Sequence, residues 1–211
     1  MVNNYDRIAK YYDFLSRTVF FKAQVNAQTE QLPFIPPGSK ILIVGGGTGW
    51  ILSKIAELQP KGLRITYIEI SSEMIALARK RDIKENSIEL INTSIEDYHT
   101  KKTFDVILTA FLFDNFGREK AELVFHKLHN LLKAEGLWLF SDFSYQPKIG
   151  KIWQYMMLKI MYFFFRMISN VEARELPDIG VYFKKNKYKK MFRKRYYKNF
   201  IKATVYQKTS L

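Results

Sequence analysis

Residues 40–50 of this 211-residue chain read KILIVGGGTGW, a short apolar run that ends in four glycines within five residues. The run from Ile41 to Val44 predicts a strand covered on both faces, because β-branched side chains fill a buried, pleated surface well. Glycines lack a Cβ, so the backbone can turn through positive φ and come close to a ligand. Apolar residues then recur at helical spacing, at Ile51, Leu52, Ile55 and Leu58. The stretch therefore predicts a strand, turn and helix that cradle a cofactor on free N–H groups of the helix start.

A carboxylate about 20 residues beyond such a turn, at the end of the next strand, can accept hydrogen bonds from ribose hydroxyls. Glu69 closes the predicted strand Arg64–Glu69 and meets this requirement. A dinucleotide motif also needs a small residue at its third glycine position, so that helix and strand pack closely. Trp50 occupies that position, which disfavours nicotinamide and flavin cofactors.

The segment Ile43–Gly49 resembles the first motif of the class I S-adenosylmethionine-dependent methyltransferases, which reads acid, apolar residue, Gly-Cys-Gly-Thr-Gly. Phe104–Leu108 is similar to the family's fourth strand, and Leu132–Leu139 to its turn into the fifth. The resemblance runs from Tyr5 to Phe143 and implies S-adenosyl-L-methionine as the cofactor.

The resemblance also implies the residues that hold this cofactor. Glu69 corresponds to the ribose-binding acid, Ser94 and its neighbours to the adenine site, and Tyr11 to the helices that often cover the cofactor. The implied set is Gly45, Gly46, Gly47, Thr48, Gly49, Glu69, Ile70, Met74, Ser94, Ile95, Glu96, Thr109 and Tyr11. Ile43 replaces the motif's usual acid, and Ser94 stands where many members carry aspartate. These departures predict fewer polar contacts and weaker cofactor binding.

Strands are expected at residues 40–44, 64–69, 87–92, 105–109 and 137–143, with helical patterns between them. Such alternation predicts right-handed crossovers and a parallel sheet. Residues 188–206 fit a closing antiparallel hairpin with Lys198 and Asn199 near its turn. With this hairpin the family's sheet is complete. The expected fold is an α/β, Rossmann-like, doubly wound, seven-stranded and mostly parallel sheet with an amino-terminal helical cap.

The whole chain is expected to form a single methyltransferase domain. It divides into a helical cap (1–38), a cofactor-binding core (39–143) and a lid helix with a closing basic hairpin (144–211). The 47% of hydrophobic residues can supply one good core. The amino terminus lacks the pattern of a secretory signal, which leads us to expect a cytoplasmic location.

Two residue types limit the chemistry. The chain has no cysteine, which excludes disulfides, thiolate metal sites and a cysteine nucleophile. His126 and His129 share a helix face but have no evident third ligand, so no metal site is predicted.

No catalytic residue is assigned. Tyr11, Tyr12 and Asp114 are candidates near the substrate, with packing in the cap as the simpler role of the tyrosines and a helix N-cap as that of Asp114.

Positive charge gathers late in the chain. Residues 151–211 hold 15 Lys and Arg against 3 Asp and Glu, and ten of these cations lie in Val181–Lys202 among aromatic residues. Lysines on the edge of the closing strands are the simplest interpretation, because they discourage edge pairing. An anionic membrane surface is the next, and nucleic acid is less favoured.

A second clue is the strongly apolar helix expected at residues 148–168. Its longest unbroken apolar run, Ile160–Phe165, is too short to cross a membrane. The helix either packs on the sheet, or serves in part as a lid over an apolar substrate or as an interfacial patch.

The sequence thus favours methyl transfer to a small, apolar molecule, and the apolar helix with the basic tail would suit a lipophilic substrate collected at a membrane surface. Methylation of RNA or another anionic polymer, and a non-catalytic binding module, remain as alternatives. The fourth strand ends without the Pro-Pro-aromatic element of amino-directed nucleic-acid methyltransferases, which disfavours base methylation. Oligomeric state is not indicated by any motif.

Overall fold

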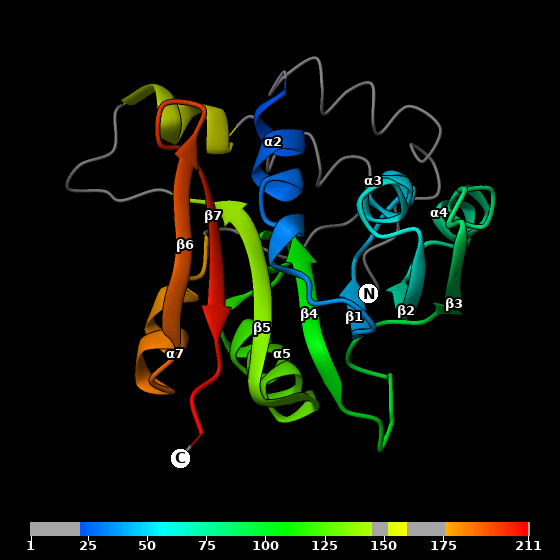
Figure 1. Ribbon diagram of the computed structural model, residues 1–211. Helices are drawn as coiled ribbons and strands as arrows, with labels where there is room; N and C mark the ends of the chain where they lie inside the picture. The colour runs from blue at the N-terminus through cyan, green and yellow to red at the C-terminus, as the bar shows by residue number, and fades with distance from the viewer. Residues whose placement is uncertain (1–21, 145–151, 160–175, 211) are drawn as a thin grey trace.

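The computed structural model describes residues 22–144, 152–159 and 176–210. These residues form a seven-stranded sheet with the order β3-β2-β1-β4-β5-β7-β6 (Figure 1). The strands are β1 Lys40–Val44, β2 Lys61–Glu69, β3 Glu85–Asn92, β4 Phe104–Ala110, β5 Leu132–Phe143, β6 Lys189–Tyr196 and β7 Ile201–Gln207. The pairings among β1 to β5 are parallel, and β7 runs antiparallel to both of its neighbours. The predicted fold, including the closing hairpin, is confirmed.

Helices cover both faces of this sheet (Figure 1). Their bounds are α2 Ala23–Thr29, η2 Leu32–Phe34, α3 Trp50–Leu58, α4 Ser72–Ala78, η3 Phe113–Asn115, α5 Arg118–Leu131 and α7 Gly180–Lys185. Residues 152–159 are helical as well. One core cluster joins α5 and α7 to the aromatic face of β5, and another joins α3 and α4 to the opposite face of β1. Ile41 to Val44 are at most 2% exposed, as expected of a strand buried on both sides.

Some connections differ from the expected pattern. Residues 93–103 carry the chain from β3 to β4 without a helix, because this polar stretch has no apolar periodicity to bury. The six-residue helix α7 was not predicted. β5 begins at Leu132 rather than Leu137 and so includes the expected turn. The expected helices before residue 22 and the rest of segment 148–168 lie outside the described residues.

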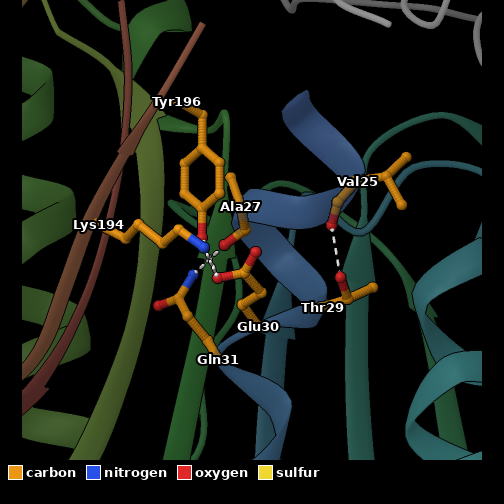
Figure 2. Close-up of polar contacts among 7 residues, drawn as sticks. All are labelled: Val25, Ala27, Thr29, Glu30, Gln31, Lys194 and Tyr196. Carbon is orange, nitrogen blue, oxygen red and sulfur yellow. Dashed lines mark hydrogen bonds and ion pairs between the residues drawn. The ribbon is translucent and has the colours of Figure 1, made fainter. Parts of the chain in front are cut away.

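The helix α2 is fixed to the late strands through polar contacts (Figure 2). The Glu30 carboxylate accepts hydrogen bonds from Lys194 Nζ at 2.7 Å and from the Tyr196 hydroxyl at 2.9 Å. Gln31 Nε2 donates to the Ala27 carbonyl at 2.7 Å and to Ser141 Oγ at 2.6 Å. These contacts hold α2 against the carboxyl-terminal half of β5.

Among the described residues, none of the helices combines the length and the apolar character that crossing a bilayer requires.

Candidate active site

The glycine turn forms residues 45–49, between the end of β1 and the start of α3. Its first N–H, from Gly45, donates to the Ile68 carbonyl at 2.9 Å and so prolongs the parallel ladder. The backbone then passes through positive φ at Gly45, Gly47 and Gly49, with angles of 65°, 63° and 74°. Gly49 is the N-cap of α3, so the free N–H groups of the helix face the same edge of the sheet as the turn.

Close packing explains why two of these positions exclude a side chain. A Cβ on Gly46 would lie 2.2 Å from Cζ of Tyr67, and one on Gly49 would lie 2.7 Å from Cα of Ala78. Tyr67 lies on β2 and is fully buried. Its hydroxyl donates to the Gly47 carbonyl at 2.8 Å. The conformation of the turn is therefore fixed by packing against Tyr67 of β2 and against Ala78 of α4.

Glu69 ends β2 beside this turn and is 6% exposed. Its Oε2 accepts a hydrogen bond from the Gly47 N–H, and its Oε1 accepts one from the Ser71 N–H, each at 2.9 Å. Ser71 in turn caps α4 by accepting from the Met74 N–H at 3.1 Å. A carboxylate oxygen can accept more than one hydrogen bond. Glu69 is thus oriented by the turn, at the position expected of the ribose-binding acid.

The residues expected around the adenine follow β3. Ile95 is buried in the same cluster as Ile68 of β2 and Leu112, whose Cδ1 would lie 3.0 Å from a Cβ on Gly45. Ser94 Oγ donates to Asp97 at 2.7 Å, and Glu96 pairs with Lys120 at 2.6 Å. Ile95 is therefore part of the core, whereas the side chains of Ser94 and Glu96 pair with other polar side chains.

The remaining predicted cofactor residues divide into three groups. Met74 is buried, with its sulfur 3.9 Å from a Cβ built on Gly47, and Ile70 directly follows Glu69. Thr109 accepts a hydrogen bond from Trp138 Nε1 at 2.9 Å, which turns its hydroxyl toward the core. Tyr11 lies outside the described residues. The cradle fits a nucleoside whose ribose meets Glu69, and the individual contacts stay predictions.

A buried acidic pair lies at the carboxyl ends of β4 and β5. Asp114 of η3 and Asp142 of β5 are 7% and 4% exposed. Burial raises the pKa of Asp142 to about 7. Burial, and then the neighbouring Asp142 charge, raise the pKa of Asp114 well above its usual value. Both shifts favour the protonated carboxyl, because burial disfavours a charged carboxylate.

Lys202 completes this group from β7, where it pairs with Asp142 across the ladder. Burial lowers the pKa of the Lys202 amine, and the Asp142 charge opposes that shift. The Asp142 carboxylate also accepts a hydrogen bond from the Phe143 N–H at 2.8 Å. Sequence reasoning missed Asp142. The N-cap role considered for Asp114 is wrong, since Gly117 caps α5.

Aromatic side chains border the same edge of the sheet. Phe111 follows β4 with a φ of 53°, an uncommon conformation for a bulky residue. Its ring lies 5.0 Å from that of Phe143, which lies 5.3 Å from Phe200. The two histidines considered above are placed elsewhere, with His129 Nδ1 2.9 Å from the Tyr188 hydroxyl. Cofactor cradle, acidic pair and aromatic border thus share the carboxyl edge, where open α/β sheets bind ligands.

Comparisons with known proteins agree with this geometry. A family model described as a methyltransferase domain matches residues 41–136. The ubiquinone/menaquinone biosynthesis C-methyltransferase UbiE of Geotalea daltonii is 28% identical over 188 residues, which are 86% of this chain and 73% of that protein. A malonyl-[acyl-carrier protein] O-methyltransferase of Bacillus anthracis is 32% identical over 105 residues, 50% of this chain. The chain spans only 38% of the length of that second relative.

Solved structures show the same fold. The 1,6-didemethyltoxoflavin-N1-methyltransferase of Burkholderia thailandensis, with bound 1,6-didemethyltoxoflavin and S-adenosylhomocysteine, superposes with a TM-score of 0.66. The superposition covers 97% of this chain and 86% of that one at 14% sequence identity. The glycine turn, the acid that ends β2 and the family match together identify this chain as a class I S-adenosylmethionine-dependent methyltransferase.

Proposed function

We propose that this methyltransferase acts on a small, apolar acceptor that binds at the carboxyl ends of β4 and β5. The observation that carries the proposal is the aromatic border formed by Phe111 and Phe143, at the same carboxyl edge of the sheet as the glycine turn. Burying an apolar molecule there gains about 25 cal/mol for each Å² removed from water. The relatives lend support, since one is named for quinone biosynthesis and a solved neighbour holds a small heterocycle.

When bound, S-adenosylmethionine supplies a methyl group already activated by its sulfonium. The chain then has to align donor and acceptor and to exclude water. Glu69 and the glycine turn position the cofactor, and the aromatic border keeps the acceptor dry. Asp142, with a pKa of about 7, is suited to accept a proton from an acidic hydroxyl of the acceptor near neutral pH.

Thermal unfolding with S-adenosylmethionine or S-adenosylhomocysteine tests the cofactor site. A ligand at 100 times its dissociation constant adds about 2.7 kcal/mol, which raises the midpoint of a protein of this size by roughly 5 to 10 °C. Glu69→Gln should abolish most of that rise. Glu57→Gln, on the exposed side of α3, is the matched control and should retain it. No rise in the native protein would favour the non-catalytic module.

The acceptor is tested separately with isotope-labelled S-adenosylmethionine. We expect label to enter lipophilic phenols or quinols and to be extracted into organic solvent. Label in RNA instead, with a steep decrease in RNA binding as salt rises, would overturn the small-molecule proposal in favour of the polymer alternative.

A further inference from the structure

The helix at residues 152–159 presents apolar side chains on both of its sides. Leu158 and Gln154 face inward, each 6% exposed. On the outward side Ile152 is 80% exposed, Met156 57% and Tyr155 48%. Spacings of three and four residues place these three on one face. Large apolar side chains grouped at the surface mark a site of interaction, whereas single ones do not.

This helix lies at the end of the β6–β7 hairpin, at the carboxyl edge of the sheet (Figure 1). Trp153 packs with its ring 5.9 Å from Phe200, and Gln154 Nε2 donates to the Lys198 carbonyl at 3.1 Å. Leu158 joins the cluster that contains Phe143. These contacts fix the helix at the carboxyl edge of the sheet, the edge that also carries the cofactor cradle. Its outward face is therefore exposed at that edge.

Exposed cations lie on this helix and near the β6–β7 turn that it packs against. Lys159 continues the outward side of the helix, with Nζ 5.3 Å from the Tyr155 ring centre. Lys198 lies in the neighbouring turn and Arg195 at the end of β6, both exposed. Asp178 is the one acidic residue in the described stretch 176–210. The apolar face thus lies within a strongly positive part of the surface.

Edge protection accounts for the lysines of β6, since this is an edge strand of the sheet. It does not account for the exposed side chains of Ile152 and Met156. Nucleic acid would pair with the cations but offers no apolar layer for two aliphatic side chains. A bilayer with anionic headgroups matches both features, because apolar side chains enter the acyl boundary while cations meet the headgroups.

We propose that the outward face of helix 152–159, together with Lys159, Arg195 and Lys198, docks on the surface of an anionic lipid bilayer. The helix lies in the interface and does not span it. Docking turns the carboxyl edge of the sheet, with its aromatic border, toward the lipid. The docking itself does not depend on the proposed acceptor.

Flotation with phosphatidylcholine vesicles, with and without phosphatidylglycerol, tests this proposal. We expect the native protein to float only with the anionic vesicles and to be released by high salt. The double variant Ile152→Glu/Met156→Glu should bind at least tenfold more weakly. Leu123→Glu is the apolar control, because Leu123 is 72% exposed on α5, away from the helix, and it should bind like the native protein.

A charge test separates specific docking from net positive charge. Arg195→Glu/Lys198→Glu should also weaken flotation, whereas the exposed pair Lys61→Glu/Lys101→Glu, with the same change in net charge, should not. Equal loss in the matched variants, or no flotation of the native protein, overturns the proposal. RNA binding that survives in the Ile152/Met156 variant, without flotation, assigns the surface to nucleic acid instead. An unchanged midpoint shift with S-adenosylhomocysteine shows that each variant is folded and separates failure of docking from failure of the cofactor site.

Discussion

The hydroxyl of Tyr67 lies 2.8 Å from the carbonyl oxygen of Gly47 and donates to it from the neighbouring strand. The two residues are 20 positions apart, and only one belongs to the glycine motif. The Tyr67 ring fills the space in which a side chain on Gly46 would lie. The shape of the cofactor cradle therefore depends on β2 as much as on the glycines.

Gly46→Ala should destabilise the protein and weaken cofactor binding. Its Cβ would meet the buried Tyr67 ring at 2.2 Å, and overpacking of this kind costs about 1–3 kcal/mol. We expect the unfolding midpoint to fall by roughly 3 to 10 °C, as measured by calorimetry. Gly117→Ala is the control for space, because a Cβ there meets nothing within 4 Å and only the smaller cost of alanine at the N-cap of α5 is expected. Equal effects of the two substitutions would contradict the packing argument.

Tyr67→Phe removes one hydroxyl and keeps the ring. The Gly47 carbonyl then loses its hydrogen bond, at a cost of about 1 kcal/mol. We expect the dissociation constant for S-adenosylhomocysteine, measured by titration calorimetry, to rise severalfold while the fold is retained. Tyr98→Phe provides the comparison, since this buried tyrosine lies in the loop between β3 and β4 and has no hydrogen bond to the turn. Unchanged affinity in Tyr67→Phe would mean that the ring alone shapes the turn.

The acidic pair should make stability depend on pH. Because burial raises the folded pKa of Asp142 to about 7, protonation favours the folded state. This stabilisation is complete below the unfolded value of about 4 and is lost as the pH rises through about 7. We expect the free energy of unfolding, measured in urea, to decrease between pH 5 and pH 8 by about 2–4 kcal/mol. Asp142→Asn should flatten this dependence, and parallel profiles for the two proteins would refute it.

Two contacts that fix α2 should differ in strength. Ser141 is buried and bridges Gln31 Nε2 and the Ala27 carbonyl, so Ser141→Ala should cost about 1–3 kcal/mol. Lys194 and Glu30 form an exposed ion pair, with 51% and 35% of their side chains accessible. Lys194→Met should therefore cost less than about 1 kcal/mol. Chemical unfolding of both variants checks the order, which a larger loss for Lys194→Met would reverse.

Local patterns predicted much of the fold. β1 has the predicted bounds, Lys40–Val44, and the turn of the closing hairpin includes Lys198 and Asn199. Both segments have a signature within a few residues. For β1 it is a continuous apolar run, and for the hairpin turn it is a break between two alternating runs. Glu69 was found in the same way, from its distance to the glycines and its place at the end of a strand.

The parts that were missed depend on contacts between distant segments. An aromatic residue within a strand ordinarily fills the core, and Tyr67 meets Gly46 because the parallel register places it beside Ile43. Asp142 is paired with Asp114 because η3 folds back over the end of β5. Neither relationship has a local signature. The helical cap before residue 22 and the domain division stay predictions.

The contacts that hold α2 against β5 and β6 have a consequence for the order in which the chain folds. Gln31 contacts a residue 110 positions later, and Glu30 contacts Tyr196 across 166 positions. During synthesis the glycine turn and β1 to β4 exist long before β6 and β7 do. A nascent chain can therefore form its central strands while α2, with its buried Ala27, still lacks its place. Contacts between such distant residues slow folding and prolong the exposure of apolar surface. The first described helix is therefore among the last to dock on the sheet.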